Sequence, residues 1–81
     1  MELKVYLDLS NEHIVIETGI SQHSTFKLFD PSGMLVLIKE VSDKEILSIK
    51  DLEEGVYHYK LVADTRLQVG KLTKFPFHHA I

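Results

Sequence analysis

The chain has 81 residues, which is room for one domain with one modest hydrophobic core. Its formal net charge at pH 7 is −3, from 12 acidic and 9 basic residues, and the basic residues are scattered along the sequence, so nucleic acid is not expected as a partner. There is no cysteine, which excludes disulfide bonds, thiol nucleophiles and cysteine-based metal sites. The longest apolar run, Met34 to Ile38, is far shorter than the ~20 residues that cross a bilayer, so no membrane insertion is expected.

Alternation of apolar and polar residues with a period of two predicts short strands along the whole chain. In the first of them we expect Leu3, Val5, Leu7 and Leu9 to share one buried face. The predicted strands, in chain order, cover residues 3–9, 14–16, 26–29, 34–41, 45–49, 56–63 and 67–75. Locally, residues 43–54 also fit a helical spacing, which is the competing interpretation of that segment.

The segment from Val56 to Ala63 is the clearest predicted strand, with its tyrosines on one side and His58 on the other. Tyr57 follows Gly55 by two residues, where a tyrosine of immunoglobulin-like sandwiches often hydrogen-bonds back across a corner. We therefore predict an all-β fold, an immunoglobulin-like antiparallel β-sandwich of about seven strands, forming a single domain over residues 1–81 with an irregular tail at about 76–81.

The segment from Asp30 to Gly33 predicts a tight turn between two strands. Pro31 sets φ for the second turn position, and the Asp30 carboxylate can accept hydrogen bonds from the backbone two residues on. Gly33 tolerates the positive φ that such a turn requires. Ser10, Ser32 and the other serines fall in turns or at strand ends, where backbone hydrogen bonding is their ordinary role.

Two stretches together resemble a known family. Residues 26–36 contain an aromatic-Asp-x-x-Gly turn, and residues 52–61, followed by 71–75, contain a Leu-x-x-Gly-x-Tyr corner and a final strand. Over residues 12–75 this order and spacing are similar to the C-terminal sorting domains of the type IX (Por) secretion system of Bacteroidetes. The resemblance implies an immunoglobulin-like sandwich at the C-terminus of a secreted cargo protein, recognised by the secretion machinery.

The resemblance also implies roles for individual residues. Asp30, Gly33, Gly55 and Tyr57 would define the fold. Lys71 and Lys74 would lie in the terminal segment that the machinery reads.

The sequence is compatible with two roles for such a domain. The chain is a piece of a larger secreted or surface protein, found between periplasm and cell surface, or it is a free-standing structural protein that self-associates, cytoplasmic if Met1 is the natural start. The first residues alternate charged and apolar side chains, so no export signal is expected within the chain itself. In both cases the partner is a protein: the secretion machinery or a second copy.

The apolar run from 34 to 38 has apolar side chains on both faces, although a sandwich buries only one face of each sheet. We expect either Leu35 and Leu37 or Met34 and Ile38 to contribute to a protein contact, such as a homodimer. The alternative is a central strand whose outer face is shielded by long neighbouring side chains.

No catalytic residue, cofactor, metal site or small-molecule substrate is expected. His13, His23 and His58 have no obvious acidic partner at a spacing that predicts a triad, and adjacent His78 and His79 point in opposite directions on an extended chain. Acidic residues 51, 53 and 54 lack the regular alternation of oxygen ligands of a calcium loop, so a solvated loop is expected.

Overall fold

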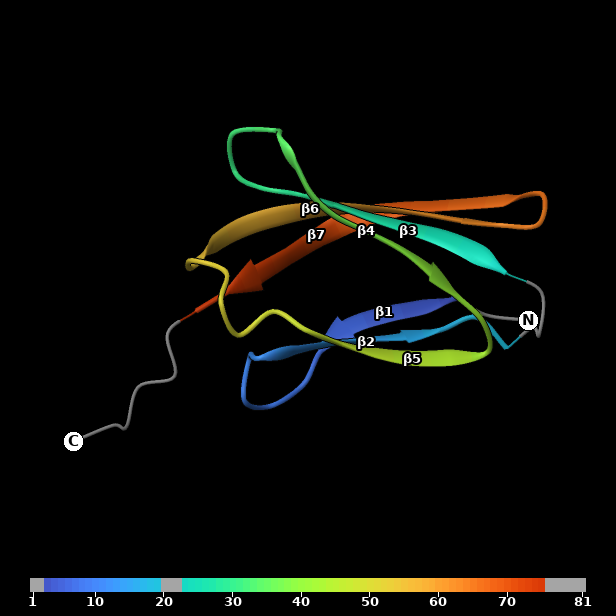
Figure 1. Cartoon of the computed structure of the whole chain (residues 1–81), viewed down its shortest axis with the longest axis horizontal. Helices are drawn as coiled ribbons and strands as arrows, with labels where there is room; N and C mark the ends of the chain where they lie inside the picture. Colours follow the sequence, from blue (N-terminus) through green and yellow to red (C-terminus); the bar gives the residue numbers. More distant parts are fainter. Residues whose placement is uncertain (1–2, 20–22, 76–81) are drawn as a thin grey trace.

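The computed structural model describes residues 3–19 and 23–75 and is all-β in this part of the chain, as predicted (Figure 1). The seven strands are β1 Lys4–Leu7, β2 His13–Glu17, β3 Ser24–Phe29, β4 Leu35–Val41, β5 Lys44–Ser48, β6 Gly55–Ala63 and β7 Arg66–Lys74. All strand pairs are antiparallel. The described residues contain no helix that could span a membrane.

The strands form two sheets that pack face to face, with strand orders β1-β2-β5 and β4-β3-β6-β7. This arrangement is that of an immunoglobulin-like sandwich, in which β1, β2 and β5 correspond to strands A, B and E and β3, β6 and β7 to C, F and G. Strand β4 extends the second sheet next to β3. The predicted fold class is therefore confirmed.

The core lies between the two sheets and follows the period-two pattern of the strands. Strand β6 alternates without a break, so that its buried side holds Tyr57, Tyr59, Leu61 and Ala63. Phe26 and Leu28 lie beside them on the neighbouring strand β3, and Ile14 and Ile16 of β2 belong to the same buried cluster from the opposite sheet. Burial of each such side chain stabilises the fold by about 1.5–3 kcal/mol before conformational entropy is counted.

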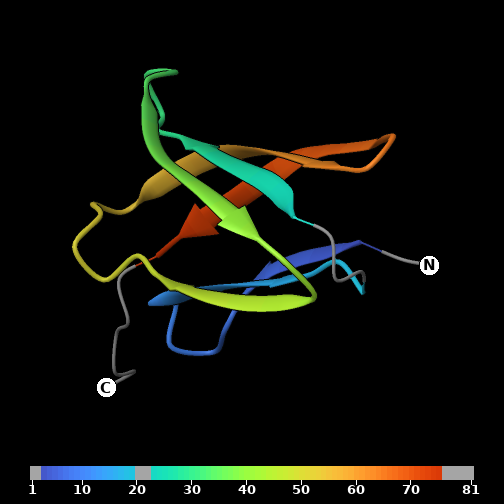
Figure 2. The same cartoon turned by 45° about the vertical axis from the view of Figure 1, so that its right-hand side comes forward.

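The chain passes from one sheet to the other between β4 and β5, which closes one side of the sandwich (Figure 2). Two residues, Ser42 and Asp43, make this passage, and Asp43 adopts φ +57°. The Asp43 carbonyl accepts hydrogen bonds from the backbone N–H groups of Thr18 (2.7 Å) and Gly19 (3.3 Å). These contacts attach the β4–β5 passage to the end of β2.

One sequence-based expectation about local structure is wrong, and one competing interpretation is excluded. Strand β1 ends at Leu7, so Leu9 does not share its buried face and is 98% exposed in the β1–β2 turn. Residues 43–54 are not helical: β5 pairs with β2 over residues 44–48, close to the predicted strand 45–49, and a turn closed by the Leu52 N–H and the Ile49 carbonyl follows. Strand pairing outweighs the local helical spacing because β2 offers a buried surface to Leu47.

Strand β4 is an edge strand, not a central one, and it contains a β-bulge. Leu28 pairs with Leu37 and Phe29 pairs with Leu35, which leaves Val36 as the extra residue. The bulge turns Leu35 to the outer face, where it is 49% exposed, while Leu37 packs against the core. Leu35 and Leu37 therefore do not share a face, contrary to the simple alternation assumed from the sequence.

Candidate functional site

The turn between β3 and β4 is organised by the carboxylate of Asp30. Its Oδ1 accepts hydrogen bonds from the Ser32 hydroxyl (2.7 Å), the Ser32 N–H (2.9 Å) and the Met34 N–H (2.9 Å). The Asp30 carbonyl accepts a further bond from the Gly33 N–H at 2.8 Å, and Gly33 has φ +93°. The hydrogen bond from the Ser32 hydroxyl and those from the backbone lower the pKa of Asp30, because they stabilise the ionised carboxylate.

A second turn, before β6, lies against the first at the same end of the molecule (Figures 1 and 2). Gly55 has φ +151°, and a Cβ at this position would lie 2.9 Å from Cγ of Pro31. Both the backbone conformation and the approach of Pro31 therefore require glycine at position 55. The two motifs that the sequence analysis identified separately meet at this contact.

Tyr57 closes the corner that this second turn begins. Its hydroxyl donates a hydrogen bond of 2.6 Å to the carbonyl of Glu53, four residues upstream, which is the corner bond expected from the sequence. Burial raises the pKa of the Tyr57 phenol, and the negative charges of Glu53 and Asp30 raise it further. The hydroxyl therefore remains protonated and available as a donor.

Lys74, at the end of β7, is tied to the same region. Its ammonium group donates to the carbonyls of Ile49 (2.6 Å), Lys50 (3.3 Å) and Leu52. These carbonyls belong to the turn that leads from β5 towards Tyr57. The Lys74 amine thus holds the turn in place from 22 to 25 residues away in sequence.

Lys71 is placed differently. It pairs with His58 of β6 and lies exposed on the outer face of the four-stranded sheet. Leu35 lies on the same outer face through its pairing with Phe29, whereas Leu37 packs against the core. Of the four residues expected to bind a partner, Lys71 and Leu35 are available on one surface, and Lys74 and Leu37 are engaged within the domain.

The sequence analysis missed a polar cluster in the β1–β2 turn. Nδ1 of His13 lies 2.8 Å from Oδ2 of Asp8, and the hydroxyl of Ser10 donates to Oδ1 of Asp8 at 2.9 Å. Partial burial alone would raise the pKa of Asp8, but the hydrogen bonds from His13, Ser10 and two backbone N–H groups lower it overall. The sequence analysis considered only acidic partners that would make a triad and did not identify Asp8, which the β1–β2 turn brings next to His13 five residues later.

This cluster does not form a catalytic triad. The carboxylate of Asp8 stands between Ser10 and His13, so the serine donates to the acid and not to the imidazole. The same carboxylate also accepts from the backbone N–H of His13, at 3.2 Å, which is the chemistry of a turn. Asn11 in this turn has φ +60°.

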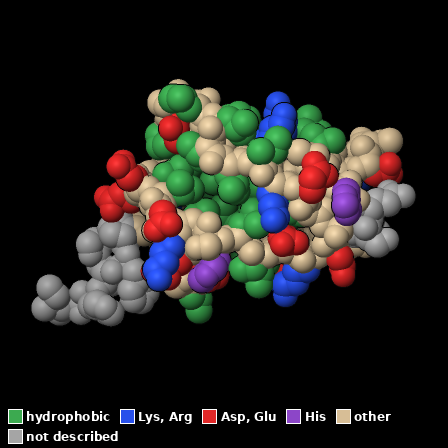
Figure 3. All heavy atoms as spheres, viewed as in Figure 1, with side chains coloured by type: hydrophobic (Ala, Val, Ile, Leu, Met, Phe, Trp, Pro, Cys, Tyr) green, Lys and Arg blue, Asp and Glu red, His purple; other side chains and the backbone are tan. Residues whose placement is uncertain are grey.

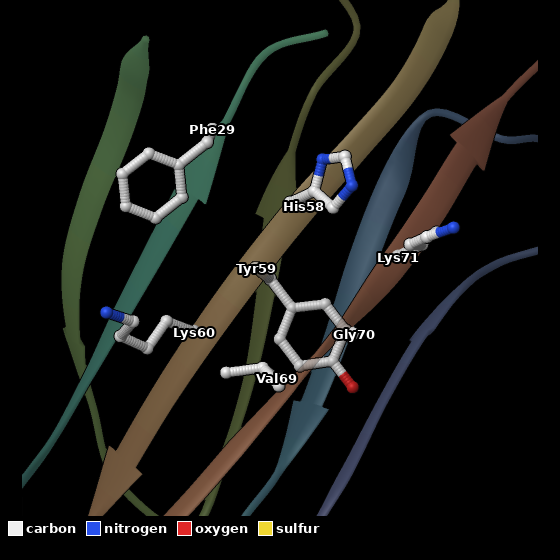
Figure 4. Close-up of a pocket in the computed structure, with 7 residues that line it drawn as sticks. All are labelled: Phe29, His58, Tyr59, Lys60, Val69, Gly70 and Lys71. Atoms are coloured by element: carbon white, nitrogen blue, oxygen red, sulfur yellow. The ribbon is translucent and has the colours of Figure 1, made fainter. Parts of the chain in front are cut away.

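Within residues 3–19 and 23–75, no three side chains of histidine, aspartate or glutamate converge in a way that could hold a metal ion. His78 and His79 lie outside the described residues. A hollow of about 340 Å³ opens between β3, β6 and β7, lined by Phe29, His58, Tyr59, Lys60, Val69, Gly70 and Lys71 (Figure 4).

These features define a class of protein: a small immunoglobulin-like sandwich whose two turn motifs stabilise one end of the fold. Comparison with known families agrees with this description and is more specific. The family model described as "secretion system C-terminal sorting domain" matches residues 5–74, so the chain belongs to this family, the sorting domains of the type IX (Por) secretion system. No curated protein matches the chain.

Proposed function

We propose that this domain is a folded, non-catalytic sorting signal that the type IX secretion machinery recognises on a larger protein. The observation that supports this proposal is the family match over residues 5–74, which includes both turn motifs and the final strand. A signal read in the folded state needs a stable surface. One end of the fold is stabilised by the contacts of Asp30, Gly55, Tyr57 and Lys74.

The chemistry of the described residues supports a recognition role in place of an enzymatic one. The Ser10, Asp8 and His13 cluster is arranged as a turn, and in residues 3–19 and 23–75 no three histidine, aspartate or glutamate side chains converge. The exposed residues of the sheet faces include lysines, such as Lys60 and Lys71, and apolar residues, such as Leu35 and Val69. Such surfaces contact other proteins.

The proposal is tested by fusing the chain to the C-terminus of a reporter that carries its own export signal to the periplasm, in a host with a type IX system. Surface-exposed or released reporter is then measured by protease accessibility and by immunoblotting of the medium. We expect delivery that depends both on the domain and on a functional type IX translocon. Reporter that stays in the periplasm would contradict the proposal.

The competing interpretation, a structural protein that binds its own copies, makes a different prediction. It is favoured by the exposed apolar residues of the edge strand β4, such as Leu35 and Ile38, which are 49% and 56% exposed. Stable oligomers of the isolated chain in sedimentation experiments, together with failed reporter delivery, would support self-association.

A further inference from the structure

The outer face of the four-stranded sheet presents an ordered set of side chains. Strand register places outward-pointing residues in rows that run across β4, β3, β6 and β7. The first row is Glu40, Thr25, Val62 and Leu67; the second is Ile38, Lys27, Lys60 and Val69; the third is Leu35, Phe29, His58 and Lys71. We call this surface the outer face.

The outer face is basic, although the chain as a whole is acidic. Three lysines, at positions 27, 60 and 71, project from it, while the rows contain a single carboxylate, that of Glu40. Glu40 lies in the first row and accepts a 3.0 Å hydrogen bond from the Thr25 hydroxyl. The rows therefore hold more lysines than carboxylates, whereas the whole chain has a formal net charge of −3.

Exposed apolar side chains lie between the lysines. Ile38, Val62, Leu67 and Val69 are 56%, 44%, 62% and 61% exposed. Figure 3 views the two sheets from the side, as Figure 1 does, and shows hydrophobic side chains on the flank that β4 crosses, with lysine side chains beside them. Exposed apolar side chains grouped among polar ones are typical of protein–protein contact sites.

The hollow gives this surface a definite shape. Lys60 and Val69 lie on one side of it, and Phe29, His58 and Lys71 lie on the other (Figure 4). Gly70 pairs with Tyr59, and a Cβ added to Gly70 would lie on the core side of the sheet, 2.7 Å from the Tyr59 ring, so position 70 places no side chain on the outer face. An apolar side chain of a partner can enter the hollow while carboxylates beside it pair with Lys60 and Lys71.

We propose that the outer face is the surface by which this domain docks on an acidic, apolar protein surface of the secretion machinery. This inference rests on the proposed function and names the chemistry of the partner. A symmetric pair of copies joined through the same surface is disfavoured, because it would bring two surfaces of the same positive charge together. A partner with carboxylates around an apolar anchor complements both the charge and the hollow.

The test uses the reporter fusion with charge reversals on the outer face, Lys60→Glu and Lys71→Glu together. The matched control is Lys44→Glu with Lys50→Glu, which makes the same change of charge at exposed lysines of β5 and the following turn. A second pair compares Val69→Ser, in the hollow, with Leu9→Ser in the β1–β2 turn. Urea denaturation of each isolated domain verifies that folding is retained.

We expect Lys60→Glu/Lys71→Glu to lower surface delivery at least about fivefold, since like charges across an interface are strongly unfavourable. Val69→Ser should lower it by a smaller factor, and both controls should be delivered as the unmodified fusion is. Equal delivery of the outer-face variants and their controls would overturn the inference while leaving the proposed function intact. Failure of the unmodified fusion would overturn the proposed function and, with it, this docking surface.

Sedimentation of the isolated domain tests whether the outer face binds a second copy of the chain instead. We expect a monomer whose mass does not change with concentration. If the chain forms dimers that Lys60→Glu/Lys71→Glu dissociates, the outer face binds a second copy and the inference is wrong.

Discussion

Gly55 and Pro31 are in contact although 24 residues separate them, and the contact leaves no room for a side chain at position 55. An added Cβ would lie 2.9 Å from Cγ of Pro31, and the glycine has φ +151°. The turn before β6 and the turn after β3 therefore stabilise each other. Residues that appear as two separate motifs in the sequence form one structural unit.

The first prediction concerns this contact. Gly55→Ala should lower the free energy of unfolding by about 2–4 kcal/mol, because it adds a steric clash to an unfavourable φ. Gly33→Ala is the matched control, since Gly33 also has a positive φ but a Cβ there meets nothing within 4 Å. In a Pro31→Ala background the cost of Gly55→Ala should fall, as urea denaturation of the double-mutant cycle would measure. An unchanged cost would show that Pro31 does not constrain position 55.

The second prediction concerns the tyrosine corner. Tyr57→Phe removes the hydrogen bond to the Glu53 carbonyl and should lower the free energy of unfolding by about 1 kcal/mol. Tyr6→Phe removes a 2.8 Å bond to the Glu17 carboxylate on an exposed surface and serves as the control, with an expected change below about 0.5 kcal/mol. Equal effects of the two variants in urea denaturation would contradict the assigned role of Tyr57.

The third prediction concerns acid stability. The pKa of Asp30 is lower in the folded protein than in the unfolded chain, so its ionised form stabilises the fold above the unfolded pKa of about 3.9. That contribution is lost as the pH falls below about 4 and through the folded pKa. Asp30→Asn should therefore flatten the fall in stability between neutral and acidic pH, and Asp8→Asn should flatten it further because the pKa of Asp8 is also lowered.

The measurement for this third prediction is the urea midpoint of each variant at several pH values from 7 to 3. The expected order of pH sensitivity is the unmodified domain, then Asp30→Asn, then the double variant. Parallel curves for all three proteins would show that these carboxylates are not the groups whose protonation destabilises the fold.

The fourth prediction separates the two lysines near the end of β7. Lys74→Met should lower the free energy of unfolding by about 1.5–3 kcal/mol, because it removes a charged donor from the carbonyls of Ile49 and Leu52. Lys71→Met, on the exposed outer face, should change it by less than about 0.5 kcal/mol.

Hydrogen exchange provides a local measurement for this fourth prediction. The amide of Leu52 donates to the Ile49 carbonyl at 3.0 Å and should exchange faster in Lys74→Met and at an unchanged rate in Lys71→Met. Similar exchange in both variants would mean that the Lys74 amine does not hold this turn.

Much of the fold could be predicted from the sequence because its signals are local. The alternation in β6 was sufficient to place Tyr57 on the buried side and His58 on the exposed side. The turn at Asp30 could be predicted because the carboxylate, Pro31 and Gly33 act within four consecutive residues. The family could be recognised because both motifs retain their order and spacing.

The remaining features were decided by tertiary structure, because they depend on strands that are distant in sequence. A one-residue bulge at Val36 separates Leu35 from Leu37, which no alternation pattern reveals. The partners of the Lys74 amine are carbonyls 22 to 25 residues earlier, and backbone carbonyls have no signature in a sequence. The sequence by itself determined the two-layer fold and its turns, since side-chain period and turn chemistry act between neighbours. Only the pairing of β4, β3, β6 and β7 decided that lysines scattered along the sequence lie together with exposed apolar residues on the outer face.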